Sequence, residues 1–104
     1  MTDGETLARA EAALGEVIDP EVGLDVVNLG LVYEIYVGDG VVCVRLTMTT
    51  PACPLSGEIV RDAEERLRAI PGVRSARVEL VWEPPWSPER MTPHAKALLG
   101  WSPA

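Results

Sequence analysis

The stretch with the most evident chemistry contains Cys53, which lies between two prolines and close to several hydroxyl side chains. A β-branched run precedes it and a helical pattern follows it, so we expect Cys53 near a helix start, with Pro54 in the first turn. The free amides of a helix N-terminus favour a thiolate, the form that binds metals or attacks electrophiles. Hydroxyls of Thr49, Thr50 and Ser56 are close enough in sequence to hydrogen-bond an anion held there. The residues alone leave open whether Cys53 is reactive or a buried, inert thiol.

Carboxylates gather in a second polar segment, nearer the start of the chain. Asp19, Glu21 and Asp25 lie close together there and are followed by the amide side chain of Asn28. Because aspartate often caps turns and Asp19 precedes a proline, one interpretation is that Asp19 caps a short turn and the other acids are solvated. The other is that a carboxylate faces Cys53 and helps to hold a metal or to orient a partner. The spacing does not decide between them.

Few other side chains in this sequence bind metals. There are two cysteines, Cys43 and Cys53, and one histidine, His94. Because a structural zinc site takes four ligands of these types, we expect no permanent metal site within a monomer. A Cys53 thiolate would instead hold a metal transiently or share it with the same thiolate of a second chain. A cysteine-dependent enzyme is the weaker alternative, since no base is evident beside the thiol.

Length and charge narrow the class of protein. The chain of 104 residues is expected to form a single domain, 1–104. Its formal net charge of −7 opposes binding to nucleic acid or to an anionic membrane, so neither is an expected partner. The start of the chain lacks a signal-peptide pattern and both cysteines are interpreted as free thiols, so the expected location is the cytoplasm.

Hydrophobic patterns predict the elements that position these residues. Apolar residues follow the helical period over 6–17 and 55–69, and alternate along 31–37, 41–48 and 75–82. Glycines around Asp39 predict a hairpin turn between the first two strands, and Cys43 is expected in the second strand without a chemical role. This order predicts an α+β fold, a two-layer domain with a small three-stranded mixed sheet and helices on one face. Its exposed edges favour a homodimer or another partner.

The segment 83–104 is rich in proline and tryptophan and is expected to run as an extended tail. Thr92 and Pro93 are a favourable N-cap and first residue for a short helix within it. Trp82 and Trp86 either anchor this tail onto the domain or present an aromatic surface to a partner. We predict a partner-binding role for both tryptophans.

Four motifs follow one another along the chain. They are Asp19-Pro20-Glu21, Asn28-Leu29-Gly30-Leu31-Val32-Tyr33, Thr49-Thr50-Pro51-Ala52-Cys53-Pro54, and Trp82-Glu83-Pro84-Pro85-Trp86 with Arg90-Met91. In this order they resemble the SufT/PaaD-like family of metal–sulfur cluster assembly factors, over nearly the whole chain. The resemblance implies a small α+β domain, a cytosolic role in iron–sulfur protein maturation and a functional cysteine. Carried onto this sequence, the implicated residues are Asp19, Glu21, Asn28, Thr49, Thr50 and Cys53.

The resemblance leads us to expect a non-catalytic assembly factor. Cys53 would transiently bind iron or an iron–sulfur cluster, a site shaped by Asp19 and Glu21, while the Trp82–Trp86 segment docks iron–sulfur assembly proteins and apo client proteins. PaaD-type members serve a ring-epoxidising oxygenase and carry a cysteine-rich C-terminal extension. No cysteine follows Cys53 in this sequence, which favours the stand-alone type. The alternatives are a metal-free adaptor of the assembly machinery or of a multicomponent oxygenase, and an oligomeric scaffold with an inert thiol.

Overall fold

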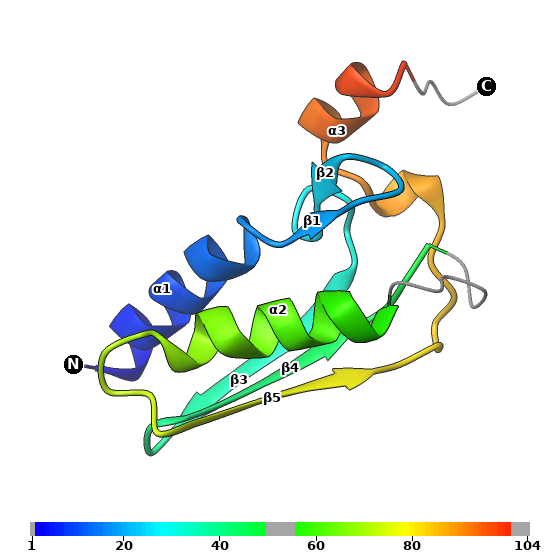
Figure 1. The fold of residues 1–104 in the computed structure, drawn as a ribbon. Helices are drawn as coiled ribbons and strands as arrows, with labels where there is room; N and C mark the ends of the chain where they lie inside the picture. Colours follow the sequence, from blue (N-terminus) through cyan, green and yellow to red (C-terminus); the bar gives the residue numbers. More distant parts are fainter. Residues whose placement is uncertain (1, 50–55, 101–104) are drawn as a thin grey trace.

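The computed structural model describes residues 2–49 and 56–100. The helices and strands are, in chain order, α1 (Asp3–Leu14), β1 (Ile18–Asp19), β2 (Leu24–Asp25), β3 (Val32–Gly38), β4 (Val41–Leu46), α2 (Ser56–Arg68), β5 (Ser75–Leu80), a 3₁₀ turn (Pro88–Arg90) and α3 (Pro93–Leu98). The three-stranded sheet has the spatial order β3-β4-β5, with β3–β4 antiparallel and β4–β5 parallel. The predicted mixed sheet is therefore confirmed (Figure 1).

The two longer helices cover one face of this sheet (Figure 1). α1 contacts both α2 and β3, and α2 contacts β5. The core between the two layers is formed by apolar side chains that include Ala10, Leu14, Val42, Val44, Leu46, Ile59, Ala63 and Leu67. Helices on one face of a small mixed sheet make this the two-layer α+β domain that the sequence patterns predict.

α1 begins earlier than predicted because of its N-terminal cap. The Glu5 amide donates a hydrogen bond to Thr2 Oγ1 at 3.1 Å, and the Glu5 carboxylate accepts one from the Thr2 amide at 3.5 Å. This capping box satisfies amides that have no partner within the helix. The helix ends at Leu14 rather than at Val17, yet Val17 is still buried, and its amide donates to the Leu14 carbonyl.

The hairpin between β3 and β4 turns at Asp39 and Gly40, as predicted. Both residues have positive φ, 52° and 77°, a geometry that suits the right-handed twist of the strands and that aspartate and glycine tolerate. One predicted orientation in β4 is wrong. The alternation along 41–48 places Thr47 with Cys43 on the solvent-facing side of the sheet, but it is 1% exposed. The strand ends at Leu46, and the Thr47 amide then donates to the Leu31 carbonyl at 2.8 Å, which turns the chain inward.

The small β1–β2 sheet is not predicted by the sequence patterns. Ile18 pairs with Asp25 and Asp19 with Leu24, and the turn between them contains Gly23 with a φ of 83°. Two-residue strands are too short for alternation to reveal them. The pairing nevertheless folds this segment into a hairpin and sets the positions of both aspartates.

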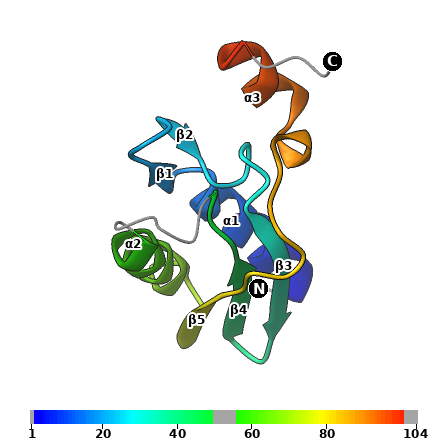
Figure 2. The ribbon, with the colours of Figure 1, turned by 90° about the vertical axis from the view of Figure 1, so that its right-hand side faces the viewer.

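The tail leaves β5, passes the end of the sheet and reaches the β1–β2 hairpin, where α3 lies (Figure 2). Along the way, the Tyr33 hydroxyl donates to the Pro84 carbonyl at 2.8 Å. α3 is the predicted short helix, and its N-cap Thr92 accepts a hydrogen bond from the Ala95 amide at 3.2 Å. None of the helices within residues 2–49 and 56–100 has the length and apolar character needed to cross a lipid bilayer.

Candidate functional site

Asp19 caps the turn between β1 and β2. Its side chain is 1% exposed, and Oδ1 accepts a hydrogen bond from the Glu21 amide at 2.9 Å. The Asp19 carbonyl also accepts one from the Gly23 amide at 2.7 Å. Glu21 extends into solvent, as the turn-capping interpretation expects. Asp25 departs from that interpretation, because it is buried rather than solvated.

The turn capped by Asp19 lies against the N-terminal half of α2. A shallow pocket between the two is lined by Ile18, Pro20, Glu58, Ile59 and Asp62. In the sequence, α2 begins at Ser56, directly after the stretch that contains Cys53. The motif Asp19-Pro20-Glu21 therefore lies beside the N-terminal half of α2, the helix that follows the Cys53 stretch in the sequence.

Two of the predicted site residues, Thr50 and Cys53, lie outside the described residues. Thr49 is described and is half-buried; it follows the buried Met48, two residues beyond the end of β4. The end of β4 and the start of α2 lie at the same end of the domain, near the β1–β2 hairpin (Figure 1).

Asn28 occupies the centre of a hydrogen-bond network that joins this hairpin to the tail. Its Nδ2 donates to Asp25 Oδ1 at 2.7 Å and its amide donates to Asp25 Oδ2 at 2.9 Å. On the other side, Thr92 Oγ1 donates to Asn28 Oδ1 at 2.6 Å, and the Thr92 amide donates to the Asn28 carbonyl at 2.9 Å. The same hydroxyl caps α3 through the Ala95 amide. Asn28 thus positions α3, a role that the sequence interpretation did not assign to it.

Gly30 allows the tail to approach this network closely. Its φ is 73°, a conformation that favours glycine, and a Cβ at this position would collide with the backbone carbonyl of Arg90. The Arg90 guanidinium lies 4.6 Å from the centre of the Tyr33 ring, a cation–π contact. The motif Asn28-Leu29-Gly30 therefore forms the surface onto which residues 86–92 are held.

Trp82, just before the tail, and Trp86, within it, have different surroundings. Trp86 is half-buried against the core, and its Nε1 donates to the Leu29 carbonyl at 2.7 Å. This bond anchors the tail, the first of the two alternatives considered for these residues. Trp82 is 42% exposed and lies just beyond β5. Of the two, Trp82 offers more aromatic surface to solvent.

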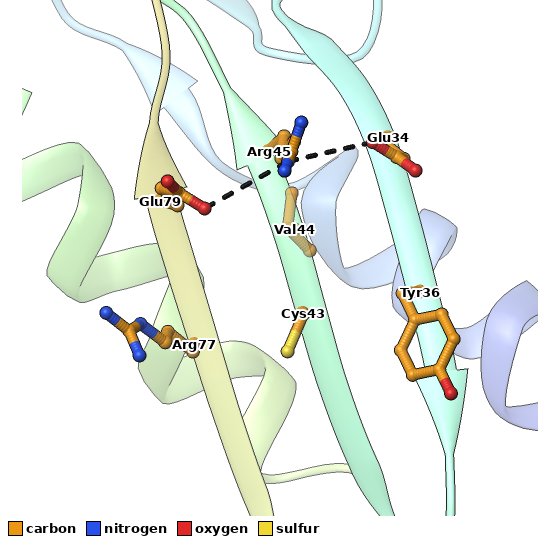
Figure 3. Close-up of a pocket in the computed structure, with 7 residues that line it drawn as sticks. All are labelled: Glu34, Tyr36, Cys43, Val44, Arg45, Arg77 and Glu79. Carbon is orange, nitrogen blue, oxygen red and sulfur yellow. Dashed lines mark ion pairs between the residues drawn. The ribbon is translucent and has the colours of Figure 1, made fainter.

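Cys43 lies on the sheet face opposite the helices. It shares a shallow depression with Tyr36 and Arg77, its neighbours on the adjacent strands (Figure 3). Arg45 on the same face lies 3.7 Å from Glu34 and 4.0 Å from Glu79. The thiol is half-buried, as expected for a strand residue on the face away from the core. Within the described part of the chain, no three His, Cys, Asp or Glu side chains lie together as a candidate metal site.

The domain is shared with proteins of known structure and family. A crystal structure of a domain of unknown function from Bacillus anthracis has a TM-score of 0.90 and 42% identity, covering 94% of each chain. The family model for iron–sulfur cluster assembly proteins matches residues 7–80. This chain therefore belongs to the family of iron–sulfur cluster assembly proteins.

Two relatives show where in that family it lies. The Fe-S protein maturation auxiliary factor SufT of Staphylococcus aureus is 45% identical over 85 residues, which cover 81% of this chain and 97% of the relative. The Fe-S protein maturation auxiliary factor YitW of Bacillus subtilis is 43% identical over 89 residues, covering 85% of this chain and 87% of the relative. The resemblance to SufT-like factors is confirmed, and with it the assignment to iron–sulfur cluster assembly.

The structure brings the predicted site residues together only in part. Asp19 and Asn28 belong to one unit, because β1–β2 pairing sets Asp19 beside the strand that carries Asp25, the partner of Asn28. Sequence reasoning missed Asp25 and Thr92 as the residues that hold Asn28. Two features of the sequence could have indicated these contacts. Asp25 precedes Asn28 by three residues, a spacing at which an aspartate side chain can accept from a backbone amide, and Thr92 is at an N-cap position.

Proposed function

We propose that this chain is a non-catalytic auxiliary factor in the maturation of iron–sulfur proteins, which holds iron or a cluster transiently through Cys53 and passes it to apo client proteins. The observation that carries the proposal is the position of the Asp19 turn against α2, the helix that follows the Cys53 stretch in sequence. The family match and the names of the two relatives support it.

The chemistry of the cargo fits a single thiolate. Cysteine thiolates are the usual protein ligands of iron–sulfur clusters. The whole sequence contains two cysteines and one histidine, so the remaining ligands would come from a second copy of the chain or from the client. On transfer, a client thiolate bonds to the iron as the bond from the iron to Cys53 Sγ breaks. The exchange changes no oxidation state, and the Cys53 thiolate is regenerated.

The neighbouring motif would shape this site rather than bind the cargo permanently. Asp19 caps its turn by accepting a hydrogen bond from the Glu21 amide, while the Glu21 side chain is exposed. An exposed carboxylate attracts cations from solution, so Glu21 would favour the approach of iron. Thr49 and Thr50 would support the thiol with their hydroxyls, and Asn28 would keep the hairpin joined to the tail.

The decisive experiment is anaerobic reconstitution with ferrous iron and sulfide, followed by visible absorption spectroscopy. We expect charge-transfer bands for the wild type that are lost in Cys53→Ser. Cys43→Ser is the matched control, because Cys43 lies in β4 on the helix-free face of the sheet; this variant should keep the bands. Identical spectra for wild type and Cys53→Ser, with unchanged client maturation in cells that carry only Cys53→Ser, would refute the proposal.

A metal-free adaptor of the assembly machinery is the second candidate, and the exposure of Trp82 favours it. If it is correct, Cys53→Ala supports client maturation normally while Trp82→Ala does not. Trp86 is a poorer probe of partner binding, because its substitution also removes the bond to the Leu29 carbonyl. Loss of maturation in Cys53→Ala together with normal maturation in Trp82→Ala would exclude the adaptor.

A further inference from the structure

The two edges of the three-stranded sheet differ in how their backbone groups are satisfied. On β5, the Val78 amide points away from β4 and donates to the Glu64 carboxylate of α2 at 3.0 Å. Arg68 of the same helix approaches the Ala76 carbonyl at 3.5 Å and pairs with Glu64 at 3.7 Å. Side chains of α2 thus occupy the β5 edge, which is one way in which proteins prevent the addition of another strand.

The β3 edge has no comparable cover within the described residues. The pair Gly38–Val41 closes the hairpin, so hydrogen-bonded and non-hydrogen-bonded pairs alternate from that point along β3. This alternation directs the amides and carbonyls of Ile35 and Val37 outward. None of these groups has a hydrogen-bond partner elsewhere in residues 2–49 or 56–100. In Figure 2, β3 is the strand farthest from α2.

A groove runs along this edge beside α1. It has a volume of about 380 Å³ and is lined by Leu7, Glu11, Val27, Val32, Tyr33, Glu34 and Ile35. Four of these are consecutive in β3. The pairing of β3 with β4 shifts register between Val32 and Glu34, so the groove follows the edge at a point where the strand is irregular. Apolar side chains make up most of the lining. Its charged residues are Glu11 and Glu34, and the Glu34 carboxylate also lies 3.7 Å from Arg45 on the helix-free face.

We infer that the β3 edge binds an extended segment of another protein as an added strand, with apolar side chains in the groove and Lys or Arg side chains at its acidic rim. The outward groups of Ile35 and Val37 would supply the main-chain hydrogen bonds of such an interface. Charge complementarity favours a basic partner, because Glu11 carries a carboxylate at the groove and the whole chain has a formal net charge of −7. This inference does not depend on Cys53.

The same charges argue against a second copy of this chain as the occupant. Each copy carries a formal net charge of −7, and the groove of each contributes the carboxylate of Glu11. Like net charges repel, so two copies associate less readily than one copy and a basic segment. The partner is therefore a different protein.

The test uses a fluorescent synthetic peptide in which valine and lysine alternate, titrated against the full chain at low salt. Fluorescence anisotropy measures binding, and amide hydrogen exchange by NMR identifies the contact. We expect saturable binding that protects the Ile35 and Val37 amides. Methylation of every second peptide nitrogen removes the donors to β3 while preserving the side chains, and should weaken binding about tenfold or more. A peptide with glutamate in place of lysine should not bind.

Two variants of the protein distinguish binding at the groove from general attraction of the basic peptide to an acidic protein. Glu11→Lys reverses a charge at the groove on an exposed helical position, and should weaken binding severalfold. Glu65→Lys makes the same change on the exposed face of α2 and should not. Equal binding of the methylated peptide, or unprotected Ile35 and Val37 amides at saturation, would overturn the inference. So would concentration-dependent protection of these amides without peptide, because a second copy would then occupy the edge.

Discussion

The side chain of Asn28 provides the sharpest test of the reasoning about the tail. Replacing it with alanine removes the 2.7 Å bond to the Asp25 carboxylate and the 2.6 Å bond from the Thr92 hydroxyl. The backbone bonds of residue 28 to both partners can persist in the variant. Asn28→Ala therefore isolates the contribution of one amide group to holding α3 against the β1–β2 hairpin.

The magnitude follows from the types of bond that are lost. A hydrogen bond to a charged group contributes about 1.5–3 kcal/mol and a neutral one about 0.5–1.5 kcal/mol. Asp25 is 9% exposed, so water can only partly replace the missing donor. We expect Asn28→Ala to lower the free energy of unfolding by about 3 kcal/mol. For a domain of this size that corresponds to a Tm lower by about 15 °C.

Urea denaturation followed by tryptophan fluorescence measures this loss, and a double-mutant cycle with Thr92→Val tests its cause. We expect a coupling energy of about 1 kcal/mol between Asn28 and Thr92, because each of the two substitutions removes the same hydrogen bond. Val27→Ala, at an exposed neighbour, is the control and should change stability by less than about 0.5 kcal/mol. The reasoning is wrong if Asn28→Ala matches this control, or if the effects at Asn28 and Thr92 are simply additive.

Three further changes test other contacts. Gly30→Ala should lower the free energy of unfolding by about 2 kcal/mol or more, since its Cβ meets the Arg90 carbonyl and its φ is 73°; a urea midpoint equal to that of the wild type would contradict this. Trp86→Phe keeps the aromatic ring but loses one hydrogen bond, so a loss of about 1 kcal/mol is expected in the same assay. An unchanged midpoint would show that this bond does not anchor the tail. Glu64→Ala frees the Val78 amide at the β5 edge, and light scattering should then detect self-association that Glu64→Gln, which keeps the acceptor, does not show. If both variants remain monomeric, the Glu64 carboxylate does not protect the β5 edge.

The elements of the fold were predictable because their signals are local. Alternation of Val42, Val44 and Leu46 places one face of β4 in the core, and glycine beside Asp39 marks the hairpin turn. These patterns depend on neighbours in sequence, which the chain geometry brings together on one face. Thr47 shows the limit of the method, because the alternation continues past the point where the strand actually ends.

The motifs allowed the family to be predicted, but not the contacts that their residues make. The motifs that contain Asp19, Asn28 and Trp86 identified the family, and the family match confirms that identification. From the resemblance we expected Asp19 and Asn28 to shape the Cys53 site, and Trp86 to bind a partner. In the structure, Asp19 caps a turn against α2, while Asn28 and Trp86 hold the tail through groups far away in the sequence.

The sequence by itself determined the α+β class, the pairing of β3 with β4, the capped helices and the membership of the assembly family. Only the tertiary structure decided that Asn28 bonds to Thr92 and that Gly30 lies under the Arg90 carbonyl. It also decided that α2 covers the β5 edge, while the β3 edge has no such cover among residues 2–49 and 56–100. The physical reason is that periodicity and capping act over a few residues. A contact across dozens of residues depends on how the whole chain packs, and the sequence pattern at neither end specifies its partner.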